Sequence, residues 1–321
     1  MHAVGCLALT VARADRAAEF YAGVLQFQTL GERAVDDGAA HVRVVRLALG
    51  SECLELREYT PGGRAKPPGE RSNDLSFQHM AIVVRDMDRA YARLRAARVR
   101  QVSTAPQRIP GWNRAAAGIR AFYFRDPDDH NLELIWFPRG KGAPRWQARG
   151  KSLFLGIDHT AIAVADTARS VAFYEGLGLR VAGESENWGP EQEHLNAVFA
   201  SRVRITALRA SEGPGIELLE YLAPADGRPF PDDLRESDVA FWQTSLVGSG
   251  TDGALLRDPD GHALRIQAEA TSALPLSADA VVGDVMSGPR CHVLLRDSLV
   301  RRNSTGPQGR LQDRRSPQRP T

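Results

Sequence analysis

Alternating hydrophobic and polar residues, followed by helix-type spacing, recur along the chain. The segment "CLALTVARADRAAEFYAGVLQF" begins at Cys6, and "HTAIAVADTARSVAFYEGLGLR" begins at His159. Each predicts a strand, a polar turn and a helix, with the Phe-Tyr pairs Phe20-Tyr21 and Phe173-Tyr174 at the same spacing from the first residue. A third copy, "HMAIVVRDMDRAYARLRAARV", begins at His79. The pattern indicates an internal repeat that opens with a strand and a helix.

Strand-like segments follow each predicted helix, so the repeating unit is βαβββ. A fourth opening strand is predicted at "FWQTSLV", starting at Phe241, and its closing strand is "HALRIQAE". The closing strands of the second and fourth units share "DPDDHNLEL", from Asp126, and "DPDGHALRI", from Asp258. Proline fixes φ, while Asp and Gly tolerate the tight turn before the last strand. The fourth unit is truncated, because most of a helix and a strand are missing from it.

The predicted units group into two domains of an α+β protein. The first domain spans residues 1–138 and the second, truncated one spans 153–270, with a polar, Gly-rich linker at 139–152. Residues 271–321 lack hydrophobic periodicity and are rich in Pro, Arg and Ser. We expect this basic tail to be disordered.

Composition narrows the function classes. The 321-residue chain is 43% hydrophobic and 25% charged, with a formal net charge of +2, which gives no electrostatic reason to expect a nucleic-acid partner. No stretch approaches the roughly 20 apolar residues that span a membrane. Cys6, Cys53 and Cys291 show no CxxC spacing, which argues against a disulfide framework or a zinc knuckle. A reducing cytoplasm is the predicted location.

Paired βαβββ modules with a Phe-Tyr helix and an Asp-Pro turn resemble the vicinal oxygen chelate superfamily. This superfamily includes glyoxalase I, methylmalonyl-CoA epimerase, bleomycin-resistance proteins and extradiol dioxygenases. The resemblance covers roughly residues 4–270. It implies that two modules form a cup-shaped mixed sheet around one divalent metal. The metal ligands would be the first residue of each opening strand and a Glu on each closing strand.

Strand alternation agrees with that placement. Leu residues flank Glu55 and Glu133 and should face the helices, which leaves the two carboxylates on the other side. The same alternation puts His79 on the side of the carboxylates. A carboxylate between two Leu residues is costly to bury unless its charge is compensated. Zn, Ni, Fe, Mn and Co all accept mixed His and carboxylate ligands.

By position, the first domain offers His79, Glu133 and Glu55 as metal ligands. Cys6 would be the fourth, where the family usually has His or Gln, and a lone Cys on a strand is more often a small core residue. In the second domain His159 and Glu217 are in place as remnants of a site. Its other two positions are predicted to hold Phe241 and Arg265. Phe has no lone pair and Arg repels a cation, so we expect the metal in the first domain and an ion pair between Arg265 and Glu217.

Three functions are compatible with these residues. The first is a glyoxalase-like lyase or isomerase that acts on a small molecule, with Glu133 or Glu55 as the proton-transfer base. Extradiol ring cleavage, which needs two His and one carboxylate on Fe(II), ranks lower. A metal-free binding or resistance protein is the third. The loops 108–113 and 187–196 either shape a substrate pocket or are plain connections. The truncated fourth module leaves a surface for a partner, so a homodimer is also among the expectations.

Overall fold

The computed structural model describes residues 1–36 and 40–268. The predicted tail, 271–321, lies outside the described residues. In the first module the elements are β1 (Ala3–Thr10), α1 (Ala14–Gly23), β2 (Gln28–Asp36), β3 (His41–Leu49) and β4 (Glu52–Thr60). In the second they are β5 (Gln78–Val84), α2 (Met87–Ala96), β6 (Arg100–Gln101), β7 (Gln107–Arg108), β8 (Arg120–Arg125) and β9 (Asn131–Trp136).

A short 3-10 helix, Pro144–Gln147, lies in the predicted linker. The third module contains β10 (Phe154–Ala163), α3 (Thr167–Gly176), β11 (Arg180–Trp188), α4 (Pro190–Asn196), β12 (Arg202–Arg209) and β13 (Gly215–Ala223). The fourth contains β14 (Trp242–Val247), β15 (Leu255–Arg257) and β16 (Ala263–Gln267). No helix stands between β14 and β15 in this described stretch, which confirms the truncation.

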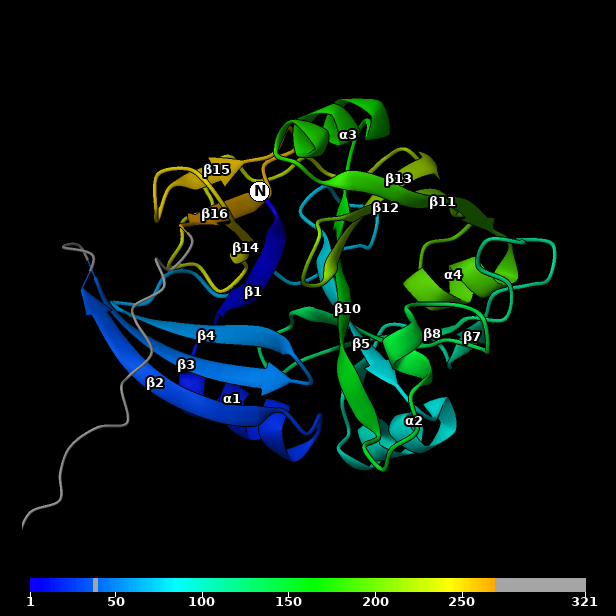
Figure 1. Ribbon diagram of the computed structural model, residues 1–321, viewed down its shortest axis with the longest axis horizontal. Helices are drawn as coiled ribbons and strands as arrows, with labels where there is room; N and C mark the ends of the chain where they lie inside the picture. The colour runs from blue at the N-terminus through cyan, green and yellow to red at the C-terminus, as the bar shows by residue number, and fades with distance from the viewer. Residues whose placement is uncertain (37–39, 269–321) are drawn as a thin grey trace, which may run out of the picture. The chain divides into compact units, whose positions relative to one another are not determined.

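The strands form two mixed sheets that combine modules distant in the sequence (Figure 1). The seven-stranded sheet has the order β15-β16-β14-β1-β4-β3-β2, so the first module pairs with the fourth. The nine-stranded sheet has the order β11-β12-β13-β10-β5-β9-β8-β6, with β7 on β8, so the second module pairs with the third. The sheets therefore do not follow the predicted domains: each takes one module from 1–138 and one from 153–270.

Within each module the opening strand pairs in parallel with the closing strand, and antiparallel contacts join the modules. Ala81 lies opposite Glu133, and Ala161 lies opposite Glu217, in the parallel pairs β5–β9 and β10–β13. The opening strands β5 and β10 pair antiparallel across the module boundary, as do β1 and β14. This arrangement places residues of two opening strands side by side in each sheet.

The two modules of each predicted domain belong to different sheets but share a hydrophobic core. The first two modules share one core on the helix side of the strands, which contains Leu54, Leu56, Met80, Ile82 and Leu134. The last two modules share a smaller core around Tyr174. Consecutive modules thus pack through the helix-facing sides of their strands. The other side of each sheet, its inner face, combines one module from each half of the chain.

Helix starts and turns follow the predicted chemistry. Asp86 and Asp166 cap α2 and α3 by accepting hydrogen bonds from the backbone N–H of Arg89 and Arg169. The tyrosine of each Phe-Tyr pair is fully buried and donates to the first Asp of an Asp-Pro turn in the next module, Tyr21 to Asp126 and Tyr174 to Asp258. These bonds join a helix of one module to the closing turn of the next. The α+β fold of tandem βαβββ modules is confirmed.

Candidate metal centre

Two histidines and a glutamate meet on the inner face of the nine-stranded sheet. His79 lies in β5, His159 in β10 and Glu133 in β9, and one ligand atom of each falls within 4.8 Å of the others. Glu133 Oε2 is 3.1 Å from His79 Nε2 and 3.4 Å from His159 Nε2. The three residues are 5% exposed or less. A buried group of two imidazoles and a carboxylate is a donor set that first-row divalent metals accept.

Glu217 completes the group from the other side of His159. Its Oε2 lies 3.4 Å from His159 Nε2, and its side chain is 23% exposed, against 6% for that of Glu133. Because β13, β10, β5 and β9 are consecutive in the sheet, the two carboxylates flank the two histidines. The second and third modules thus each supply one histidine and one glutamate to the group.

The imidazole nitrogens have the free lone pairs that a metal needs. Among the described residues, Nε2 of His79 and Nε2 of His159 have no hydrogen-bond partner although both are buried. His159 Nδ1 lies 3.0 Å from Asp158 Oδ2, so the carboxylate accepts Nδ1–H and leaves Nε2 free to ligate. Asp158 is held in turn by the indole N–H of Trp146 and the guanidinium of Arg209. The residues present therefore fit a divalent cation.

The electrostatics of the centre also favour a cation. Burial opposes a charge on His159, but the surrounding carboxylates, Glu217 first among them, outweigh it and raise the pKa of His159 to about 10. Burial also favours the neutral form of Glu133, yet the imidazoles of His159 and His79 lower the pKa of Glu133 below its usual range. The negative charge that holds a proton on His159 favours a divalent metal in its place.

Cys6 and Glu55, predicted to join His79 and Glu133, lie instead on the inner face of the seven-stranded sheet. Leu7 pairs with Leu54 in the parallel β1–β4 register, which brings Cys6 beside Cys53, and a disulfide joins them. Cys6 therefore has no thiolate to offer, and the expected absence of a disulfide was wrong. The reason is that two isolated cysteines became neighbours through sheet register, which no spacing motif reveals.

The Glu55 carboxylate is compensated by arginines rather than by a metal. Arg33 Nη2 lies 3.3 Å from Glu55 Oε1, and Arg57 Nε lies 3.6 Å from Glu55 Oε2. Arg46 donates to both sulfurs of the disulfide. The seven-stranded inner face therefore already contains the cations that neutralise its buried carboxylate.

The fourth ligand position was assigned two residues too early. Ser245 lies opposite Arg265 just as Ala81 lies opposite Glu133, so Gln243, not Phe241, stands where His79 stands. Phe241 corresponds to Phe77: each donates its backbone N–H to the aspartate three residues before it, Asp238 or Asp74. A sequence signal for this register existed, since the Arg, Asp and Phe spacing at 71, 74 and 77 recurs at 235, 238 and 241.

Arg265 does not pair with Glu217, because the two lie in different sheets. Its guanidinium donates to Glu236, to Gln243 Oε1 and to the backbone carbonyl of Gly253. The predicted exclusion of a metal by Arg265 therefore applies to the seven-stranded sheet. His159 and Glu217, taken for remnants, lie beside His79 and Glu133.

A cavity of about 100 Å³ opens onto the metal-ligand group. Glu133, His159 and Glu217 line one side of it. Both segments left open in the sequence reach it, with Ile109 from the loop 108–113 and Gln192 from 187–196, which forms the end of β11 and the helix α4 rather than a loop. Trp112 of the first segment contacts Trp188 of the second, with their ring centroids 3.8 Å apart. The volume is below the about 300–1,000 Å³ of drug-sized sites, so the cavity suits a small molecule.

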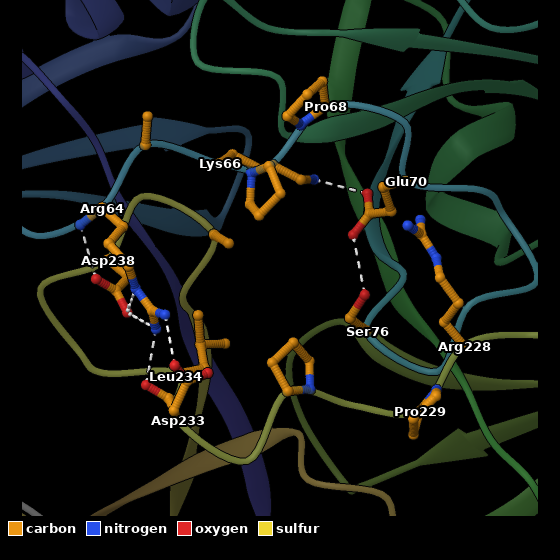
Figure 2. A pocket seen from close by; sticks show the side chains of 14 residues that line it. Arg64, Lys66, Pro68, Glu70, Ser76, Arg228, Pro229, Asp233, Leu234 and Asp238 are labelled. Carbon is orange, nitrogen blue, oxygen red and sulfur yellow. Dashed lines mark hydrogen bonds and ion pairs between the residues drawn. The ribbon is translucent and has the colours of Figure 1, made fainter.

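A larger cavity of about 290 Å³ lies between the loops that precede β5 and β14 (Figure 2). Its charged side chains are already paired with one another or with neighbouring loops, as Figure 2 shows for Lys66 with Glu70 and for Arg64 with Asp238. Among the described residues that line it, none is a histidine or cysteine. It lacks the ligand set of the first cavity, so the group of His79, Glu133, His159 and Glu217 is the candidate metal centre.

The comparisons with known proteins agree with this fold. A model of the Glyoxalase/Bleomycin resistance protein/Dioxygenase superfamily matches residues 3–134 and 156–266. The chain belongs to this superfamily. Over 152 residues it is 36% identical to a 2-epi-5-epi-valiolone epimerase from Actinomyces sp., which covers 43% of this chain and 81% of that protein.

Solved structures share the fold over most of the chain. Glyoxalase I from Zea mays aligns with a TM-score of 0.55 at 15% identity, covering 83% of this chain and 92% of that one. A putative dioxygenase from Bacillus subtilis aligns with a TM-score of 0.52 at 14% identity, covering 84% and 86%. Within the described part of the chain, no helix is long and apolar enough to cross a membrane.

Proposed function

We propose that this protein is a metal-dependent epimerase that moves a proton on the carbon beside the carbonyl of a small hydroxyketone. One observation carries the proposal: two carboxylates, Glu133 and Glu217, flank two buried imidazoles beside a small cavity. His79, His159 and Glu133 would hold the cation, with Glu217 at its open side. When bound, the cation supplies Lewis acidity that stabilises negative charge on the substrate oxygens.

The carboxylates of the site supply the proton transfer. Glu217 is the more accessible one, and burial together with repulsion from Glu133 and Asp158 raises its pKa above the usual range. A raised pKa brings a carboxylate closer to the value suited to a general base near neutral pH. Glu217 would remove the proton, and Glu133, on the other flank of the histidines, would return it to the opposite face of the carbon. Such a transfer inverts the carbon and conserves every atom.

The similarity to an epimerase supports this direction of chemistry. The relative is named for 2-epi-5-epi-valiolone, a cyclic ketone, and the chain spans most of that relative's length. We propose that the substrate of this protein belongs to the same class of hydroxylated cyclic ketones. The cavity volume is in keeping with one small ring.

Metal analysis and proton exchange test the proposal together. Protein purified without chelator should contain about one equivalent of a divalent metal per chain. In D₂O it should exchange the proton next to the carbonyl of 2-epi-5-epi-valiolone, observed by NMR, and EDTA should abolish the exchange. Protein without metal under every trial ion, with ligand binding unchanged by EDTA, would instead indicate the metal-free binding protein.

Ring cleavage is a second candidate, because His79, His159 and Glu133 also form a two-histidine, one-carboxylate set. Glu217 favours epimerisation over it, since an additional carboxylate at the site is a base that ring cleavage on Fe(II) does not need. Oxygen consumption by the Fe(II)-loaded protein with catechol distinguishes the two. Consumption coupled to loss of the aromatic ring would favour the dioxygenase.

A further inference from the structure

We infer that Gln192 determines substrate specificity by binding a hydroxyl group of the substrate. This inference rests on the proposed function and extends it to the wall of the cavity. Gln192 lies on α4, between β11 and β12, and lines the same cavity as Glu133 and Glu217 of the metal centre. Its residue is only 4% exposed.

The amide of Gln192 is buried without a partner. Among the described residues none donates a hydrogen bond to its Oε1, and the atom has almost no contact with solvent. Leaving an amide oxygen buried and unpaired is unfavourable, so such a group in a cavity wall indicates that a ligand or an ordered water supplies the missing donor. Donor side chains such as those of Ser185 and Tyr221 also line this cavity, but neither bonds to the Gln192 oxygen.

Contacts with the second module hold α4 in place, so Gln192 is positioned before a substrate arrives. The hydroxyl of Ser103 donates to the backbone carbonyl of Leu195 at 2.6 Å, and that of Ser72 donates to the carbonyl of Asn196 at 2.8 Å. The backbone N–H of Thr104 donates to the carbonyl of His194 at 3.0 Å. These bonds satisfy the last carbonyls of the helix and attach it to the module that carries His79 and Glu133.

The chemistry of the cavity selects the ligand class. An amide both donates and accepts, which matches a hydroxyl. Of the described residues that line this cavity, none is Arg or Lys, while Glu133 and Glu217 carry acidic groups into it. Most other lining side chains are aliphatic, such as Ile119 and Ile205, and suit the carbon faces of a ring.

Two cyclic ketones test the inference. Pentahydroxycyclohexanone (inosose) and α-hydroxycyclohexanone (adipoin) both have vicinal oxygens for the metal, but inosose also has hydroxyls across the ring. Calorimetry on the metal-loaded wild type should show tighter binding of inosose. The Gln192→Met variant should lose about tenfold of this preference, the size expected for one hydrogen bond to a buried amide. Its affinity for adipoin and its metal content should stay unchanged.

His194→Ala is the matched control. The His194 side chain is exposed on the same helix, and the bond that His194 makes to Thr104 uses its backbone carbonyl, which the substitution keeps. It should behave as wild type. An unchanged preference in Gln192→Met would overturn the inference and show that the amide holds only water, as would wild-type protein that binds neither ketone. Proton exchange in D₂O reports separately on the proposed function: a Gln192-dependent preference without exchange would support the binding role and overturn the epimerase.

Discussion

The inner faces of the two sheets are built from different pairs of modules in the same register, yet their chemistry is opposite. The nine-stranded face presents His79, Glu133, His159 and Glu217. At the matching positions the seven-stranded face presents Cys6, Glu55, Gln243 and Arg265. The first set concentrates negative charge and free imidazole nitrogens. The second set contains a disulfide, and its buried carboxylate is neutralised by arginines.

The difference teaches that module position alone does not make a site. Both faces place two opening strands side by side and surround them with closing strands. A metal needs lone pairs and uncompensated negative charge there, and only residue identity supplies them. On the seven-stranded face the same positions form structural contacts, a disulfide and an arginine-carboxylate pair. Exchanging residues between the faces would therefore separate fold from function.

The largest expected effect is loss of the metal from one face without change at the other. His159→Ala should reduce the bound metal from about one equivalent to near zero, because it removes one of three buried ligands. Gln243→Ala, the matched change on the seven-stranded face, should leave the metal content unchanged. Elemental analysis of both purified variants measures this. A drop in the metal content of Gln243→Ala would show that the metal lies on the seven-stranded face, contrary to our assignment.

The next effect concerns the rate of proton transfer. Glu217→Gln should lower α-proton exchange by about 10²–10⁴-fold, the usual contribution of a positioned general base. Glu55→Gln, at the equivalent position of the other face, should exchange at the wild-type rate. NMR in D₂O compares the two variants. Equal losses in both, or none in Glu217→Gln, would contradict the assignment of the base.

The smallest effect on the metal centre is expected from the disulfide. Cys6→Ser removes a cross-link between residues 47 apart in the sequence, which should lower the free energy of unfolding by about 2–4 kcal/mol. Metal content and exchange rate should remain those of the wild type. Guanidinium denaturation without reductant gives the first quantity. A loss of metal would show that the two faces are coupled.

Much of the local structure was predictable. Alternation placed Leu54 and Leu56 in the helix-side core and Glu55 on the inner face, and it did the same for Glu133 between its leucines; both assignments are confirmed by the core. The truncated fourth module was also predicted. The predicted ligand position at Phe241 was wrong by two residues, because the register expected for the strand β14 was shifted by two. The homodimer and the cytoplasmic location stay predictions.

The sequence by itself determined which side chains of each strand face the helices, because successive side chains of a strand point to opposite faces of the sheet. It also determined three βαβββ modules and a truncated fourth, since their turns and caps use neighbouring residues. Only the tertiary structure decided which modules share a sheet. That choice depends on how β5 joins β10 and β1 joins β14, contacts between segments far apart in the chain. For this reason His159 and Glu217 became partners of His79 and Glu133, and Cys6 became the partner of Cys53.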